Sequence, residues 1–314
     1  MLDLTNFKNF NHAGEEVLKY LHNHLGFELW MITRTVGEDW IVLQAKNNDY
    51  GVVPGQVFKW ADSYCSQMVQ GKGPRIAPNA QEIPLYAAAG INKLVDIKAY
   101  MGQPLLNEDG SLFGTLCAID SSSQPKSIEH SNDLLEIFSL LLSKILQIEL
   151  KLNEQLRVAE KLKMDSLTDH LTSLFNRRAW DNLLELEENR CKTYGHPTTI
   201  IVIDLNDLKK INDELGHKEG DRLIQNTAAI LKKSVRSNDL VARLGGDEFA
   251  ILNIETNLEN TQKLADRILK SLNEAGISVA LGIASRDPSK GLKAAVSDAD
   301  REMYKNKRKA KSLG

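Results

Sequence analysis

The stretch Arg243-Leu-Gly-Gly-Asp-Glu-Phe249 decides how the second half of this 314-residue chain is expected to fold. Apolar runs at Leu240–Leu244 and Phe249–Ile254 flank Gly245–Glu248, which is the pattern of two strands joined by a tight turn. The glycines carry no Cβ atom, so a phosphate or a base can approach the turn and accept hydrogen bonds from its N–H groups. The turn therefore predicts a ligand site, although an acidic hairpin without any ligand has the same local sequence.

A second carboxylate ends an apolar strand upstream of this hairpin. The β-branched run Thr198–Asp204 finishes with Asp204, and Asp247 stands in the hairpin turn. If the two strands are neighbours, both carboxylates lie at one edge of a sheet. There they can share Mg²⁺, a hard cation that prefers oxygen ligands.

The rest of the second half alternates between helix and strand. Helices are predicted at Asp221–Val235, Asn260–Ala275 and Lys293–Lys311, and a further strand is predicted at Ile277–Ala284. This order predicts an α+β domain whose central sheet is mainly antiparallel and surrounded by helices.

The first half has the pattern of a separate mixed α/β domain. We predict helices at Glu15–Leu25 and Lys59–Gln70, and strands at Glu28–Thr33, Asp39–Gln44, Ile97–Pro104 and Ser111–Ile119. The last two strands are joined by Asn-Glu-Asp-Gly at positions 107–110, a strong turn signal.

A long helix is predicted to connect the two halves. Its apolar residues recur at intervals of four and three, at Leu134, Phe138, Leu141, Ile145, Ile148 and Leu152, and then, after a polar Gln155, at Ala159 and Leu162. This spacing favours a coiled coil with a second copy of the chain, while the alternative is one amphipathic helix packed on its own domain. The chain is thus divided into a domain over residues 1–125, a helical linker over 126–164 and a second domain over 165–314.

Net charge and the lack of targeting signals exclude some classes of partner and location. Lys and Arg total 39 against 42 Asp and Glu, a formal net charge of −3, so nucleic acid is not an expected partner. Neither a secretory signal nor a membrane-spanning stretch is recognised, so we expect a cytoplasmic protein that does not bind a membrane. Cys65, Cys117 and Cys191 lack CxxC spacing, which favours free thiols.

Four segments together resemble the GGDEF family of diguanylate cyclases over about Asp165–Gly314. They are Asp169–Arg178 (DHLTSLFNRR), Asp204–Asp213 (DLNDLKKIND), the pairs Gly216-His217 and Gly220-Asp221, and RLGGDEF itself. Members of this family join two GTP molecules into cyclic di-GMP and release two pyrophosphates. The resemblance implies a nucleotide-cyclase-like fold and a homodimer, because each domain holds one GTP.

The resemblance also implies roles for single residues. Asp204, the carbonyl of Leu205 and Asp247 match the ligands of Mg²⁺ or Mn²⁺. Asp247 would assist deprotonation of the attacking 3′-hydroxyl, with Glu248 as a supporting catalytic position. Asn212 and Asp221 match the pair that reads guanine, and Asp221 implies selectivity for guanine. The other implied substrate-binding residues are Leu208, Lys209, Gly246, Lys307 and Lys311.

Two basic features leave alternatives open. Lys307 and Lys311 share one helical face and would hold the triphosphate, although a solvated basic tail has the same composition. Arg236-Ser-Asn-Asp239, nine residues before Gly245, matches the family's inhibitory RxxD motif and implies feedback inhibition by bound cyclic di-GMP. The alternative is a loop with a helix-ending arginine and a turn aspartate.

The first half resembles a GAF sensor domain in Gly102–Leu105, Asp109-Gly110 and Phe113–Asp120, but its ligand is not readable from the sequence. The chain is therefore expected to be a sensor-regulated, dimeric diguanylate cyclase. The alternatives are a catalytically silent receptor for GTP or cyclic di-GMP and a dimeric signalling scaffold.

Overall fold

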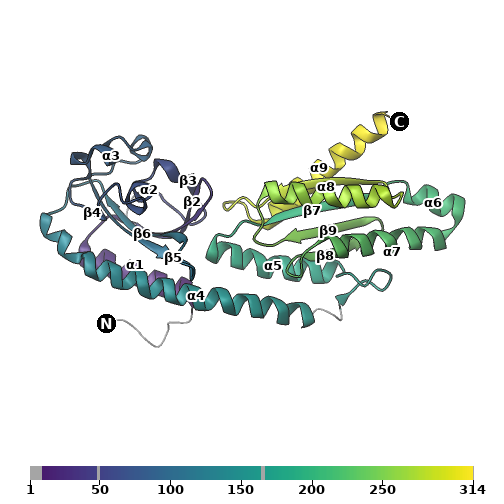
Figure 1. Cartoon of the computed structure of the whole chain (residues 1–314), viewed down its shortest axis with the longest axis horizontal. Coiled ribbons are helices and arrows are strands. Elements are labelled where there is room, and N and C mark those ends of the chain that lie inside the picture. Colours follow the sequence, from purple (N-terminus) through teal and green to yellow (C-terminus); the bar gives the residue numbers. More distant parts are fainter. Residues whose placement is uncertain (1–8, 48–49, 164–166, 314) are drawn as a thin grey trace. The chain divides into compact units, whose positions relative to one another are not determined.

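Two compact units make up the protein, whose computed structural model describes residues 9–47, 50–163 and 167–313, with side chains up to residue 309. The first unit runs to Glu154 and includes Lys192–Gly195. The second contains Gln155–Cys191 and the chain from His196 onwards. Each unit has a sheet of its own with a hydrophobic core on either face (Figure 1).

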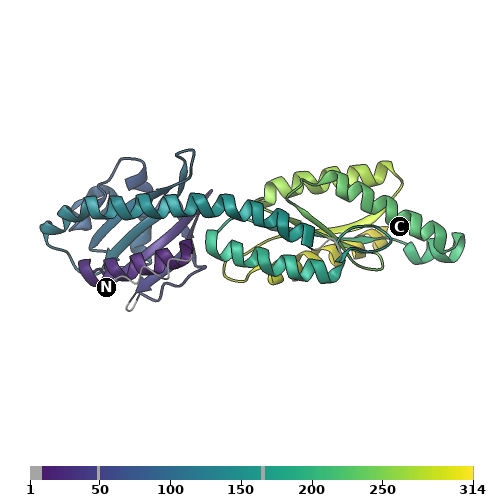
Figure 2. The same ribbon diagram turned by 90° about the horizontal axis from the view of Figure 1, so that it is seen from below.

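An antiparallel sheet of six strands forms the first unit, in the order β3-β2-β1-β6-β5-β4. The strands are β1 (Leu29–Val36), β2 (Asp39–Asn47), β3 (Val57–Lys59), β4 (Ile76–Ala77), β5 (Ala99–Leu106) and β6 (Leu112–Asp120). Helices α1 (Phe10–Leu25) and α4 (Asn132–Lys163) cover one face, and the short helices α2 (Tyr64–Val69) and α3 (Pro84–Ala87) lie over the other (Figures 1 and 2). The strands predicted for this half are confirmed.

The helix predicted at Lys59–Gln70 is confirmed only over Tyr64–Val69, and its first part is wrong. That segment contains the end of β3, a 3₁₀ turn at Trp60–Asp62 and then α2. Phe58 and Trp60 pack around Trp40, with ring centroids 5.8 and 6.4 Å from it, which holds the chain beside β2. A new helix starts only after Ser63, whose hydroxyl accepts a hydrogen bond from the N–H of Ser66.

Helix α4 divides its apolar residues between two faces. Leu135, Leu142 and Leu146 are buried in the core of the first unit, although they lie outside the predicted seam. The seam itself is split, because Leu134, Phe138 and Ile145 pack partly against the same core. Its other large members, Leu141, Ile148, Leu152 and Leu162, are exposed.

The second unit is built on a four-stranded antiparallel sheet in the order β10-β7-β9-β8, which confirms the predicted sheet type. The strands are β7 (Thr199–Leu205), β8 (Leu240–Gly245), β9 (Glu248–Asn253) and β10 (Val279–Ser285). Helices α5 (Arg177–Tyr194) and α9 (Leu292–Leu313) pack on one face, and α7 (His217–Ser234) and α8 (Leu258–Glu274) pack on the other. Helix α6 (Leu208–Leu215) connects β7 to α7.

Among the described residues, none of the helices has the length and apolar content that crossing a membrane requires. The three cysteines are buried, with free thiols.

Candidate active site

The end of β7 and the turn between β8 and β9 lie next to each other. Strands β7 and β9 pair antiparallel, with Asp204 opposite Glu248. The N–H of Leu205 donates to the carbonyl oxygen of Asp247 at 3.0 Å. The two segments that carry the predicted metal carboxylates, Asp204 and Asp247, are therefore neighbours at one edge of the sheet.

Asp204 is buried, with 7% of its surface exposed, and it forms an ion pair with Lys307 of α9. A buried carboxylate needs a compensating charge or hydrogen bonds, and the Lys307 ammonium supplies both. The structure thus brings together two site residues that are about a hundred positions apart in the sequence. The positive charge of the Lys307 side chain therefore lies next to Asp204 at this edge of the sheet.

The glycine turn is held in shape by arginine side chains. Arg243 donates from Nε and Nη2 to the carbonyl oxygen of Gly246, at 3.0 and 2.7 Å, and also pairs with Asp169 at 3.1 Å. Arg177 donates to the carbonyl oxygen of Leu244 at 2.9 Å. Burial raises the pKa of Asp169, but hydrogen bonds from Thr172 and Arg243 outweigh burial and lower it. The DHLTSLFNRR segment therefore acts here as a support for the turn.

The two predicted guanine-reading residues lie where α6 meets α7. Asp207, in the left-handed conformation with φ of 59°, turns the chain from β7 into α6. A Cβ atom at Gly220 would lie 2.0 Å from Oδ1 of Asn212, so glycine permits the close approach of the two helices. Asn212 is half-buried, and Asp221, the next residue after Gly220, is exposed.

A cleft of about 710 Å³ opens along this edge. It is lined by Leu205, Asn206, Asp207, Leu208, Lys209, Lys210, Asp213, Glu214, Asp247, Ser278 and Lys307. Five predicted site residues are among these, namely Leu205, Leu208, Lys209, Asp247 and Lys307.

Asn206, which lies within the Asp204–Asp213 motif, and Ser278 also line the cleft, although the sequence assigned neither of them a role. The side-chain amide of Asn206 donates to the hydroxyl of Ser278 at 2.9 Å, a contact between residues far apart in the chain. The side chain of Lys311 lies outside the described residues.

A known protein family matches the second half of the chain. The family model described as diguanylate cyclase, GGDEF domain, matches residues 166–312. Residues 166–312 form a GGDEF domain.

Individual relatives cover the chain only in part. The chain is 33% identical to diguanylate cyclase DgcP of Escherichia coli over 68% of its own length and 65% of the relative's. It is 29% identical to diguanylate cyclase DgcP of Pseudomonas aeruginosa, over 64% of its own length and 31% of the relative's. Among solved structures, the GGDEF domain of DgcB from Caulobacter crescentus in complex with c-di-GMP matches with 27% identity and a TM-score of 0.44. That match covers 46% of this chain and 91% of the other. The chain thus spans less than two thirds of the curated relatives named here.

The RxxD turn of the GGDEF domain is organised around a buried carboxylate. Asp239 is 8% exposed, and its two oxygens accept hydrogen bonds from the N–H groups of Arg236 (3.0 Å) and Ile254 (3.1 Å). The side chain of Arg236 is exposed. The two motif residues therefore differ in setting, since Asp239 fixes the turn while Arg236 faces solvent.

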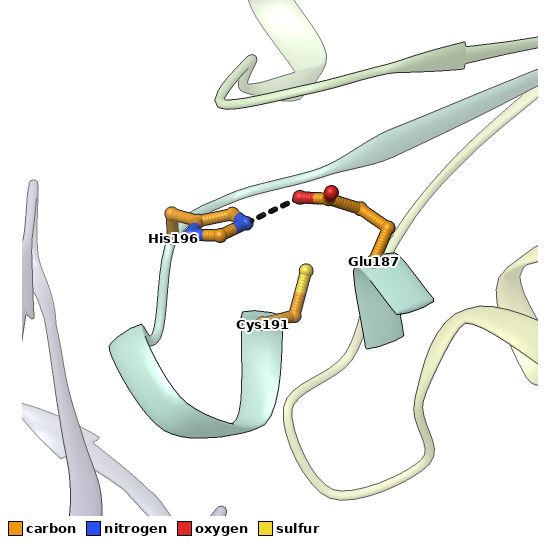
Figure 3. A group of neighbouring side chains, drawn as sticks. All are labelled: Glu187, Cys191 and His196. Atoms are coloured by element: carbon orange, nitrogen blue, oxygen red, sulfur yellow. Dashed lines mark hydrogen bonds and ion pairs between the residues drawn. The ribbon is translucent and has the colours of Figure 1, made fainter. Parts of the chain in front are cut away.

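A buried charge cluster of the GGDEF domain was not predicted from the sequence. Nε2 of His196 lies 2.8 Å from Oε1 of Glu187, with Cys191 beside both (Figure 3). Burial lowers the pKa of His196, but Cys191 and Glu187 outweigh it and raise that pKa to about 9. Burial raises the pKa of Glu187, but His196 and Arg157 outweigh it and lower that pKa to about 2.

This trio contains residue types that bind metals, yet its carboxylate is already paired with arginines. Arg157 and Arg190 pair with Glu187 at 2.9 and 3.2 Å. Two guanidinium groups against the only carboxylate of the trio repel a divalent cation. The cluster is therefore a buried ion-pair network.

Proposed function

We propose that this protein is a diguanylate cyclase that joins two GTP molecules into cyclic di-GMP and releases two pyrophosphates. The observation that carries the proposal is the meeting of Asp204 and Asp247 at one sheet edge, with the Lys307 ammonium against Asp204. The family-model match over residues 166–312 and the diguanylate cyclase names of the curated relatives support it.

The donor set at this edge fits a hard divalent cation. Asp204, the carbonyl of Leu205 and Asp247 offer oxygen atoms only, and the pairing of Asp204 with an ammonium group indicates a position suited to positive charge. Mg²⁺ or Mn²⁺ bound there would neutralise the triphosphate and polarise the α-phosphorus. Lys307 would then be released from Asp204 to contact the phosphates, together with Lys311.

Residues in the cleft and beside it would orient the nucleotide. Asn212 can satisfy the acceptors of guanine, and Asp221 can accept from its N1–H and exocyclic amine. The main chain at Gly246, together with Leu208 and Lys209, would hold the phosphates next to the N-terminus of α6. These contacts together would select GTP.

Bond formation needs a base and a second active site. Asp247 would accept the proton of the 3′-hydroxyl as it attacks the α-phosphorus of the opposing GTP, with Glu248 in support. One GGDEF domain holds one GTP, so two domains must face each other before either bond can form. We include a homodimer in the proposal for this reason.

The exposed apolar residues of α4 are the surface proposed for that dimer. Leu141 is 53% exposed and Ile148 is 67% exposed, and Leu152 and Leu162 continue the stripe. Apolar residues at spacings of four and seven on one helix favour pairing with the same helix of a second copy.

Regulation is proposed at the RxxD turn and at the first unit, and the turn is considered first. Cyclic di-GMP would bind at the RxxD turn, where the exposed guanidinium of Arg236 can pair with the Hoogsteen edge of guanine. Asp239 would use the lone pairs left over from its two backbone hydrogen bonds. Product binding at this turn would give feedback inhibition.

The first unit is proposed to be a GAF-like sensor over residues 1–125, joined to the catalytic domain (165–314) by the helical linker 126–164. Its six-stranded antiparallel sheet, with long helices on one face and short ones on the other, supports this assignment. A small apolar cavity of about 20 Å³, lined by Met31, Trp40, Tyr100 and other core residues, lies between the sheet and α2. A ligand for the sensor is not part of the proposal.

The decisive experiment incubates the full chain with GTP and Mg²⁺ and resolves the nucleotides by chromatography with mass detection. Asp247→Asn should lower cyclic di-GMP formation by about 100-fold or more, because it removes a charge at the metal edge while keeping the side chain's size. Asp266→Asn, the same change at an exposed site on α8, is the matched control. A wild-type dimer that makes no cyclic di-GMP would favour a silent receptor or a scaffold.

A further inference from the structure

The last turns of α4, from Gln155 onwards, belong to the second unit rather than to the first. Arg157, Glu160 and Lys161 follow one another at spacings of three and one, which places all three on one side of the helix. Each of them contacts a different part of the GGDEF domain. The end of the linker helix is therefore anchored by polar contacts.

Arg157 and Glu160 form the anchor itself. Arg157 pairs with Glu187 at 2.9 Å and with Glu255, just after β9, at 2.8 Å. Glu160 pairs with Arg190 at 2.6 Å. Glu187 is the buried member of the cluster in Figure 3, and it holds two guanidinium groups and His196 at once. Removing one partner from such a network leaves an uncompensated buried charge, so the helix end is held firmly.

Lys161 reaches from this anchored helix end to the RxxD turn. Its Nζ donates to the carbonyl oxygens of Ser237 (2.6 Å), Asn238 (2.8 Å) and Asp239 (3.0 Å). An ammonium group has three hydrogens, so all of its donors are used on three successive carbonyls. Burial lowers the pKa of Lys161 to about 8, so the group still carries its charge at neutral pH.

The RxxD turn is thus fixed from two sides. The carboxylate of Asp239 accepts from the N–H groups of Arg236 and Ile254, while Lys161 binds the carbonyl groups of the same turn. Together they leave the guanidinium of Arg236 facing solvent. The conformation that presents Arg236 is therefore tied to the position of α4.

We propose that Lys161 is a positioning residue for the ligand site at Arg236 and Asp239, and that ligand binding there and docking of the end of α4 stabilise each other. This inference rests on the proposed role of the RxxD turn as a cyclic di-GMP site. Coupling between two sites is reciprocal in free energy, so bound cyclic di-GMP would hold the linker helix, and an undocked helix would bind cyclic di-GMP less well. The affinity of the turn for cyclic di-GMP would then depend on whether the end of α4 is docked.

The first test measures the affinity of the full chain for cyclic di-GMP by isothermal titration calorimetry, without GTP. Lys161→Met removes the three hydrogen bonds but keeps much of the side chain's length, and it should weaken binding about tenfold. Lys163→Met removes the same charge from an exposed position two residues away and should change the affinity less than about twofold. Arg236→Ala should abolish detectable binding.

The second test follows hydrogen exchange of residues 155–163 with and without cyclic di-GMP. In the wild type, saturation with cyclic di-GMP should slow exchange at the end of α4, and in Lys161→Met it should not. If Lys161→Met fails to fold by circular dichroism, Lys161→Arg replaces it. The planar guanidinium cannot direct three donors to the same three carbonyls, so this variant should also bind more weakly.

Two kinds of result would overturn the inference. One is binding in the Lys161 variant that is as tight as in the wild type, or exchange at residues 155–163 that does not respond to bound cyclic di-GMP. The other is a wild type that does not bind cyclic di-GMP at all, which would remove the proposed product site together with the coupling. The first result leaves the product site standing, so the two failures are distinguishable.

Discussion

Two buried aspartates of the GGDEF domain have opposite surroundings. Asp204 is compensated by one side chain, that of Lys307, which under the proposed function would give way to a metal ion. Asp239 is compensated by two backbone N–H groups, which stay in place as long as the turn does. One buried aspartate is thus paired with a side chain, and the other is hydrogen-bonded to the main chain.

Gly220 gives a prediction for GTP binding. Gly220→Ala places a methyl group against Oδ1 of Asn212, so the amide must move and the KM for GTP should rise about tenfold. Stability should stay the same or increase by up to about 1 kcal/mol, because alanine is the better helix former. Steady-state kinetics and thermal unfolding check both parts. Asn226→Ala, exposed on the same helix, is the control, and an unchanged KM would argue against a guanine-reading role for Asn212.

His196 gives a prediction for pH dependence. Its pKa is raised to about 9 in the folded chain, so its contribution to stability is complete below the usual value near 6.5 and is lost as the pH rises through 9. The free energy of unfolding of the GGDEF domain should fall by ~3 kcal/mol across that window. His196→Gln should remove this slope. Urea unfolding at about pH 6 and about pH 9 measures it, and parallel pH profiles for the two proteins would contradict the prediction.

At the scale of elements, local pattern predicted most of the regular structure. The strands β7, β8 and β9 and the hairpin turn were predicted because apolar runs and a glycine turn are local signals. The start of the helix predicted at Lys59–Gln70 was wrong because the conformation around Trp60 depends on packing against Trp40. The cluster around Glu187 escaped prediction since its partners come from α4, α5 and the loop before β7.

The candidate site was predicted to a similar extent. Asp204, Asp247 and Lys307 were found because motif positions carry them, and the structure brings them to one edge. Ser278 was missed because only the pairing of β10 with β7 brings it to Asn206. The three contacts of Lys161 join a helix to a turn more than seventy residues away, and no local spacing encodes such a contact.

The exposed stripe on α4 gives a prediction at this scale. Leu141→Asp combined with Ile148→Asp should abolish the dimer and lower cyclic di-GMP formation by about 100-fold, because charges would line an apolar helix pair. Both side chains are exposed, so each chain should still fold. Light scattering gives the oligomeric state, and the nucleotide assay gives turnover. Glu154→Gln on the same helix is the control, and a double variant that stays dimeric and active would rule out this surface.

At the scale of the whole molecule, the two units have separate cores and are expected to unfold separately. A ligand stabilises only the part that binds it. Cyclic di-GMP should therefore raise the temperature of one calorimetric transition, that of the GGDEF domain, and leave the other unchanged. Arg236→Ala should show two transitions and no shift in either. A single transition that moves as a whole would indicate that the units unfold as one.

The strand order of the second unit affects how strongly a substitution disturbs the sheet. Strand β7, which ends in Asp204, lies between β10 and β9, whereas β8, which follows the RxxD turn, is the outer strand. A substitution on the inner strand disturbs two neighbouring strands, whereas one on the outer strand disturbs β9 and the single bridge to Phe175. Substitutions in the RxxD turn would therefore change the proposed feedback control with little effect on β7, whereas β8 ends in the Gly245–Glu248 turn and is constrained by the proposed chemistry as well.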